Sequence, residues 1–173
     1  MSKKYVYLFS EGNREMRKRL GGKGANLAEM TNAGLPGPQG FTVTTEACTR
    51  YYADDRHIAP EIKDEIIAFM GKLEEITGKA FGNKDNPLLV SVRSGSRASI
   101  PGMTVPIHNL GLTDAGAEGL AAKTGNHRCA YDSDRRSSPK FSDAVLEQPN
   151  TANDQLLDDR KAEQTRTTVQ ALN

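Results

Sequence analysis

Two segments of the sequence combine cations with glycine or small polar residues, a combination suited to binding phosphate. The first is Gly21-Gly22-Lys23-Gly24, which comes just before a helical pattern that begins at Ala25. Phosphate recognition needs backbone N–H groups that can be approached closely and a cation, often beside a helix N-terminus. Lys23 is therefore a candidate phosphate ligand. A glycine pair before a helix is also common turn chemistry, and in that interpretation Lys23 is an ordinary solvated side chain.

The second segment follows an apolar strand pattern at Leu88–Arg93. It places Arg93 and Arg97 around Ser94-Gly95-Ser96 and stays glycine-punctuated as far as Thr104. Planar guanidinium groups can engage two phosphate oxygens together, and loops that follow strands are common ligand sites in α/β sheets. Both arginines are therefore candidate phosphate ligands. An ordinary polar loop with one arginine in a structural ion pair is an equally good interpretation.

Other site chemistries have little support in the sequence. Neither segment completes a P-loop or a G-x-G-x-x-G fingerprint. Metal-ligand spacing is absent among His57, His108 and His127. The cysteines, Cys48 and Cys129, form no C-x-x-C pair, and Cys48 is expected to be a small core residue on its helix. No catalytic residue and no metal ligand is assigned.

Composition and charge limit the classes of partner. Lys and Arg number 23 against 22 Asp and Glu, so a net charge of +1 offers no general attraction for nucleic acid or an anionic membrane. The basic cluster at 14–19 has no interleaved aromatic residues and is expected to be a solvated face. No run approaches the ~20 apolar residues of a membrane span, and no signal peptide is recognised. A cytoplasmic protein without nucleic-acid or membrane partners is expected.

The elements that must position the two segments form a mixed α/β pattern. Strand-like runs and helical periodicities follow one another along the first hundred residues. Strands are predicted at 5–9, 40–44 and 88–93, and helices at 25–34, 45–52 and 60–78, with shorter helices at 113–124 and 128–136. In the helix at 60–78, the predicted apolar face is formed by Ile62, Ile66, Met70 and Leu73, with Ile67 and Ile76 beside them.

The sequence changes character after Arg136. Pro139 and Pro149 interrupt the pattern and apolar residues become sparse as far as Asn173. Such a segment buries too little apolar surface to offset its ordering entropy. We therefore predict one domain at 1–136, followed by a poorly packed, degraded or disordered tail at 137–173, and no continuation of the helix past Arg136.

Four of these segments together resemble the amino-terminal part of the pyruvate, phosphate dikinase family. They are the runs at 4–9, 21–30, 40–48 and 88–95, and the resemblance becomes patchier toward Asp143. It implies the first subdomain of an ATP-grasp-like nucleotide-binding domain, in which two α/β subdomains close over ATP and magnesium. In this family a phosphoryl group of ATP passes to a histidine on a separate domain and then to pyruvate.

The resemblance also implies roles for individual residues. Lys23 matches the family's phosphate-contacting lysine, and Arg93 matches its nucleotide-phosphate arginine. Gly102, Met103 and Thr104 overlie the glycine loop that covers the phosphates, and Arg97 joins this set from its place in the same loop. The family loop typically reads Pro-Gly-Met-Met-Asp-Thr, whereas here Thr104 follows Met103 directly and is followed by Val105-Pro106, which removes an acid and adds a residue without an N–H donor.

The implied function is the ATP-binding part of a pyruvate, phosphate dikinase, a kinase. Magnesium ligands are expected on a second subdomain, and the phosphoryl acceptors on further domains, which this sequence does not contain. The chain alone is therefore expected to bind ATP weakly and to be inactive. Its expected partners are ATP and the rest of a full-length dikinase or a homologous chain.

Two alternatives stay open from sequence. One is a non-catalytic, truncated remnant that acts as an interaction or regulatory module, suggested by the altered loop and the degraded tail. The other is a closer match to the phosphoenolpyruvate synthases or water dikinases. The run Thr44–Cys48 favours the phosphate-using enzymes over the second alternative.

Overall fold

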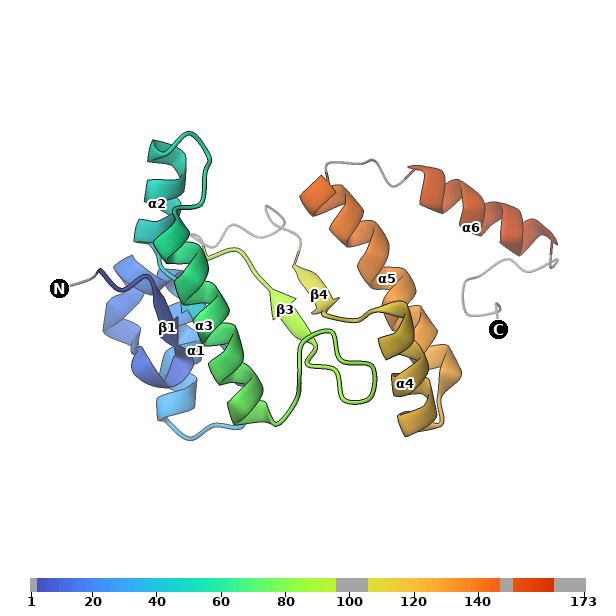
Figure 1. The fold of residues 1–173 in the computed structure, drawn as a ribbon, viewed down its shortest axis with the longest axis horizontal. Helices are drawn as coiled ribbons and strands as arrows, with labels where there is room; N and C mark the ends of the chain where they lie inside the picture. Colours follow the sequence, from blue (N-terminus) through green and yellow to red (C-terminus); the bar gives the residue numbers. More distant parts are fainter. Residues whose placement is uncertain (1–2, 96–105, 147–150, 164–173) are drawn as a thin grey trace. The chain divides into compact units, whose positions relative to one another are not determined.

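The computed structural model describes residues 3–95, 106–146 and 151–163. The chain divides into two compact units, one made of residues 1–79 and 94–104 and the other of residues 80–93 and 105–173. Each contains helices and a two-stranded antiparallel sheet within its described part, which confirms the predicted mixed α/β class (Figure 1).

The first unit is built around a short antiparallel sheet. Val6 pairs with Val43 and Leu8 pairs with Phe41 across it. The strands and helices predicted for this region are present, and only the helix expected from residue 25 begins much earlier. The described elements are β1 (Val6–Leu8), the 3₁₀ turns η1 (Phe9–Glu11) and η2 (Arg14–Met16), α1 (Arg17–Asn32), β2 (Phe41–Val43), α2 (Thr45–Ala53) and α3 (Pro60–Thr77).

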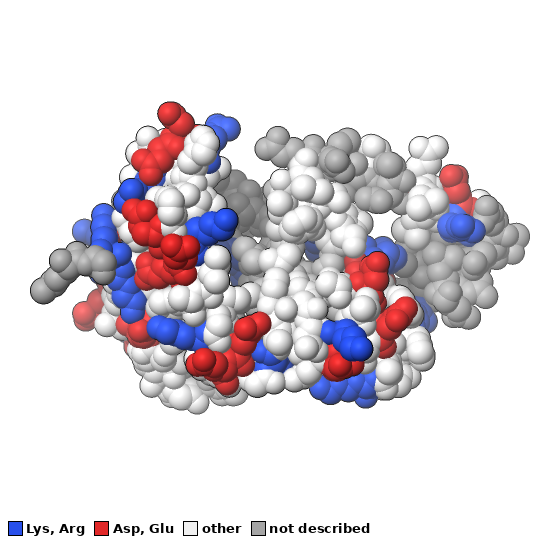
Figure 2. All heavy atoms as spheres, in the orientation of Figure 1, with Lys and Arg blue, Asp and Glu red and all other residues white. Residues whose placement is uncertain are grey.

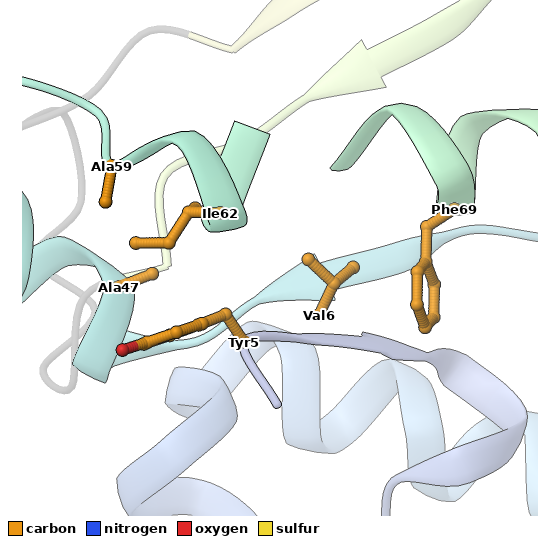
Figure 3. Packing of buried hydrophobic residues seen from close by; sticks show 6 residues of the cluster. All are labelled: Tyr5, Val6, Ala47, Ala59, Ile62 and Phe69. Atoms are coloured by element: carbon orange, nitrogen blue, oxygen red, sulfur yellow. The ribbon is translucent and has the colours of Figure 1, made fainter. Parts of the chain in front are cut away.

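Apolar side chains from β1, α2 and α3, and from residues next to them, form the core of this unit (Figure 3). Phe69 packs edge to face against Phe41, with 6.2 Å between the ring centroids. The predicted face of α3 is confirmed at Ile62 and Leu73, which are both 3% exposed. The flanking residues differ from the prediction, because Ile67 is 59% exposed and Ile76 is 51% exposed, while Phe69 is buried. The core cluster consists of Tyr5, Val6, Ala47, Ala59, Ile62 and Phe69.

The carboxylate of Glu65 joins α3 to the backbone of β1. Its Oε2 accepts a hydrogen bond from the Tyr5 N–H at 2.9 Å, and its Oε1 accepts one from the Val6 N–H at 3.1 Å. Tyr5 and Val6 are only 3% and 0% exposed, so water cannot replace this acceptor. Buried backbone donors need partners, and Glu65 supplies both here. The glutamate therefore holds α3 against the sheet.

The second unit contains a second antiparallel pair of strands and the remaining helices. β3 (Val90–Val92) pairs with β4 (Ile107–Leu110), and α5 (His127–Leu146) packs on both β4 and α4 (Asp114–Thr124). The strand predicted at 88–93 is shorter than expected, and its apolar pattern does not correspond to a buried strand: Val92 is 49% exposed, whereas Leu88, before the strand, is buried. The described elements are β3 (Val90–Val92), β4 (Ile107–Leu110), α4 (Asp114–Thr124), α5 (His127–Leu146) and α6 (Thr151–Glu163).

The helix α5 continues through the region predicted to lose helical structure. The prediction that no helix extends beyond Arg136 is wrong, because α5 includes Pro139 in its interior. A proline removes one helical donor and is normally disfavoured there. Here the Ser137 hydroxyl donates to the His108 carbonyl oxygen at 2.5 Å, so contact with β4 holds the helix at this point. Residues 147–150 and 164–173 lie outside the described residues, and the prediction for them stays a prediction.

No helix in the described ranges is long and apolar enough to span a membrane. A cytoplasmic location stays a prediction from the sequence.

We predict that Glu65→Ala lowers the free energy of unfolding by about 2–4 kcal/mol, because two buried N–H groups lose their acceptor. Urea denaturation followed by circular dichroism measures this loss. Glu75→Ala, which removes an exposed carboxylate from the same helix, is the matched control and is expected to change stability by less than about 0.5 kcal/mol. Equal losses in the two variants would contradict the role given to Glu65.

Asp134 on α5 is expected to make the stability of the folded chain depend on pH. Burial, and then the negative charge of Asp114, raise the pKa of the Asp134 carboxyl above its ordinary value. A raised pKa in the folded state means that stability is fully present below the ordinary Asp pKa of about 3.9 and is lost as pH rises through the raised value. Asp134→Asn is therefore expected to stabilise the chain at pH 7 and to give no gain near pH 3.

Melting temperatures at the two pH values test this expectation. Asp143→Asn, at an exposed position of the same helix, serves as the control. A gain for Asp134→Asn that is the same at both pH values would show that removal of the charge is not its cause.

Candidate functional site

The helix α1 is interrupted at Gly21, where φ is 72° and ψ is 173°. Glycine adopts a positive φ without the steric cost that other residues incur. The break leaves a short first segment that ends at Leu20 and a second segment that starts at Gly22. The prediction of a glycine loop before the helix is therefore wrong in extent. One glycine redirects the chain, and Lys23 and Gly24 already lie in the first turn of the second segment.

Gly24 is explained by packing against the sheet. A Cβ atom at this position would lie 2.8 Å from both Cγ2 and Oγ1 of Thr42 on β2. Real Cβ atoms do not come so close to their neighbours, so only glycine lets α1 approach β2 in this way. The positive φ of Gly21 and the close packing of Gly24 on Thr42 therefore explain why glycine stands at these two positions. A role in phosphate binding rests on Lys23 rather than on them.

Lys23 lies beside the start of the second predicted segment. Its Nζ donates to the carbonyl oxygen of Ser94 at 3.4 Å, across 71 positions of the sequence. A Cβ placed on Gly95 would lie 3.8 Å from the carbonyl oxygen of Leu20, so residues 94–95 pass along the break in α1. Since the bond is long and an ammonium has three donors, Lys23 keeps capacity for a ligand. The structure therefore brings the first predicted segment into contact with the start of the second.

The other predicted site residues are described only in part. Arg93 comes directly after β3, is exposed and belongs to the second unit. Arg97, Gly102, Met103 and Thr104 lie outside the described residues. The phosphate-binding roles of all five stay predictions.

Charges of both signs are interspersed over the face of the molecule shown in Figure 2. The residues of the basic cluster at 14–19 that carry positive charge are exposed, as predicted. Arg19 donates to the Tyr7 hydroxyl at 3.0 Å and pairs with Glu46 at 3.6 Å. This cluster is therefore partly neutralised by the unit's own side chains.

Cys48 is exposed on α2, so the prediction that it is a core residue is wrong. Its neighbour Ala47 takes the buried position, with 4% exposure. Successive helical residues are about 100° apart around the axis, so an error of one residue is enough to turn a side chain from the core to solvent.

A magnesium site is not formed by the described part of the chain. No group of three or more His, Cys, Asp or Glu side chains there could hold a metal ion. Magnesium prefers oxygen ligands, several of them carboxylates or phosphates, and the surroundings of Lys23 offer a cation instead. No step of a reaction is assigned through a metal here.

Comparison with known proteins identifies the class of domain to which this region belongs. Residues 17–75, which include α1 with Lys23, match the family model described as pyruvate phosphate dikinase, AMP/ATP-binding domain. The elements from α1 to most of α3 therefore carry the sequence of an AMP/ATP-binding domain.

Relatives of known name extend the match over nearly the whole chain. Pyruvate, phosphate dikinase from Clostridium symbiosum is 57% identical over 160 residues, which are 92% of this chain. The protein of the same name from Rhizobium meliloti (strain 1021) is 44% identical over 92% of the chain, and pyruvate, phosphate dikinase 2 from Zea mays is 47% identical over 88%. The chain belongs to the pyruvate, phosphate dikinase family, which confirms the resemblance inferred from sequence. It spans about 18% of the length of the curated relatives it matches.

The packing at Gly24 leads to a prediction about stability. Gly24→Ala is expected to cost about 1–3 kcal/mol, because the new methyl group must displace Thr42 or push α1 away from β2. Gly71→Ala is the matched control, since a Cβ there meets nothing within 4 Å in the middle of α3 and should leave stability equal or up to about 1 kcal/mol higher. Chemical denaturation of the full chain measures both. A neutral Gly24→Ala would show that α1 is not closely packed on β2.

Proposed function

We propose that this chain binds ATP through its phosphates, with Lys23 as the central cation of the site. The observation that carries the proposal is the contact between the Lys23 Nζ and the Ser94 carbonyl oxygen at 3.4 Å. It joins two segments that each combine a cation with small residues. The first of them also lies within the match to an AMP/ATP-binding domain.

The proposed chemistry is electrostatic. The ammonium of Lys23 is a compact charge with three donors, so it can keep the Ser94 carbonyl as one partner and offer the others to phosphate oxygens. Arg93, which precedes Ser94 in the chain, would add a guanidinium able to engage two oxygens. We propose that Arg97 and the loop residues Gly102, Met103 and Thr104 complete the set. Neutralisation of charge and orientation of the transferred group are the usual protein contributions to phosphoryl transfer.

We further propose that the chain contributes this site to a kinase of the pyruvate, phosphate dikinase type with an ATP-grasp arrangement. The phosphoryl group would pass from ATP to a histidine on another domain and then to pyruvate. Magnesium would neutralise phosphate charge, held by carboxylates that the described residues do not provide. The chain by itself is then a nucleotide-binding part, whose partner is the rest of a dikinase or a homologous chain.

The alternative of a degraded remnant stays open, because the described tail is helical but Leu156 of α6 is 61% exposed. It was suggested by the altered loop and by the tail expected to be poorly ordered. Residues 137–146 belong to α5 and residues 151–163 form α6, so this part of the expected tail is helical. The altered loop at 104–106 falls almost wholly outside the described residues.

Titration of the full chain with Mg·ATP in a calorimeter tests the proposal. Lys23→Ala is expected to weaken binding about 10- to 100-fold, the effect of losing one charge-assisted hydrogen bond. Arg93→Ala is expected to act in the same direction. Lys63→Ala removes an exposed lysine from α3 and should bind as the unaltered chain does.

Equal affinities for the unaltered chain, Lys23→Ala and Arg93→Ala would remove the nucleotide site from these residues. A loss of equal size in Lys63→Ala would show that overall charge, and not a site, governs the binding.

A further inference from the structure

We infer that Thr45 is a positioning residue for the proposed nucleotide site and acts through Lys23. The inference rests on the proposed function of Lys23. It is carried by the hydroxyl of Thr45, which donates to the carbonyl oxygen of Lys18 at 2.7 Å. This bond joins the start of α2 to the segment of α1 that precedes the break.

The break at Gly21 explains why this carbonyl needs a donor from elsewhere. In an uninterrupted α-helix the carbonyl of Lys18 accepts from the N–H four residues later, at Gly22. The dihedral angles of Gly21 are not helical and lie between these two groups. The last carbonyls of a helical segment lack regular partners, and side chains commonly satisfy them. Thr45 does so here and thereby holds the first segment of α1 against α2.

The second segment of α1 is held separately, by β2. Gly24 lies against Thr42, and Ala25 and Ala28 are both fully buried. Thr42 and Thr45 stand only three positions apart, so one short stretch of chain holds both sides of the break. The segment from Thr42 to Thr45 is in turn anchored to β1: Thr44 is 1% exposed, and its N–H donates to the Tyr5 carbonyl oxygen at 2.8 Å.

The direction of Lys23 follows from these two attachments. It lies in the first turn after the break, so the angle between the two segments decides how the turn meets residues 94–95. Leu20, on the other side of the break, presents its carbonyl oxygen to Gly95. Loss of the Thr45 hydroxyl would remove the backbone attachment of the first segment, which Arg19 also joins to Tyr7 and Glu46, and would leave the second segment in place. The contact of Lys23 with Ser94 would then be less well defined, and a phosphate would meet a cation that is no longer held in one place.

The test compares three side chains at one position. Thr45→Val keeps the branched shape and removes the donor, Thr45→Ser restores the donor, and Thr45→Ala serves as a second donor-free variant if valine prevents folding. Thr49→Val is the matched control, because its hydroxyl also donates to a backbone carbonyl, that of Thr45, at 3.0 Å on the same helix. Mg·ATP affinity is measured for each full-length variant well below its melting temperature.

The donor-free variants are expected to bind Mg·ATP about three- to tenfold more weakly, as for loss of one hydrogen bond. Thr45→Ser and Thr49→Val are expected to stay within about twofold of the unaltered chain, a difference under half a kilocalorie. The measurement is repeated in the Lys23→Ala background, where Thr45→Val should cause no further loss. A structural effect unrelated to Lys23 would persist in that background.

The outcomes separate this inference from the proposed function. If Lys23→Ala weakens binding and Thr45→Val does not, the role of Thr45 is overturned and the nucleotide site stands. An equal loss from Thr45→Val with and without Lys23, or an equal loss from Thr49→Val, also overturns it. If the unaltered chain binds no Mg·ATP, both proposals fall together.

Discussion

The first unit depends on a carboxylate that completes a strand too short to hold itself. β1 and β2 have three residues each, and a two-stranded sheet of this size is not stable alone. Glu65 supplies acceptors for two buried N–H groups of β1 and so attaches the sheet to α3. The carbonyl of Tyr5 then receives the N–H of Thr44, which places the start of α2. Through these bonds the support extends from α3 to the break in α1, and so to Lys23.

Local patterns were enough to predict most helices and strands of this unit. Pro60 at the first turn of α3 and Gly78 just after its end, with φ of 65°, are the signals expected of a helix of that length. Lys23 could be singled out as a candidate from residue type and spacing, because phosphate chemistry uses few kinds of side chain. Glu65 could not be found in the same way. Its partners lie 59 and 60 positions away, and a glutamate on a helix is usually only a solvated residue.

The errors arose where tertiary contacts outweigh local preference. Pro139 predicts the end of a helix, yet the bond from Ser137 to β4 holds α5 across it. The pattern Gly21-Gly22-Lys23-Gly24 predicts a loop, yet one positive φ and one close contact with Thr42 account for two of the glycines. Neither contact can be recognised from the neighbouring sequence. The roles proposed for Arg93 and Arg97 stay predictions, because testing them needs the same kind of long-range information.

The division of the chain into units has a consequence for its synthesis. Residues 94–104 belong to the first unit, although in sequence they lie between β3 and β4 of the second. The ribosome delivers the chain from its amino end, so β1, α1, β2, α2 and α3 can assemble before Ser94 has emerged. The partner of the Lys23 ammonium therefore arrives late, on a segment bordered by strands of the other unit. The contact of Lys23 with Ser94 therefore forms during the same stage of synthesis in which β3 and β4 can pair.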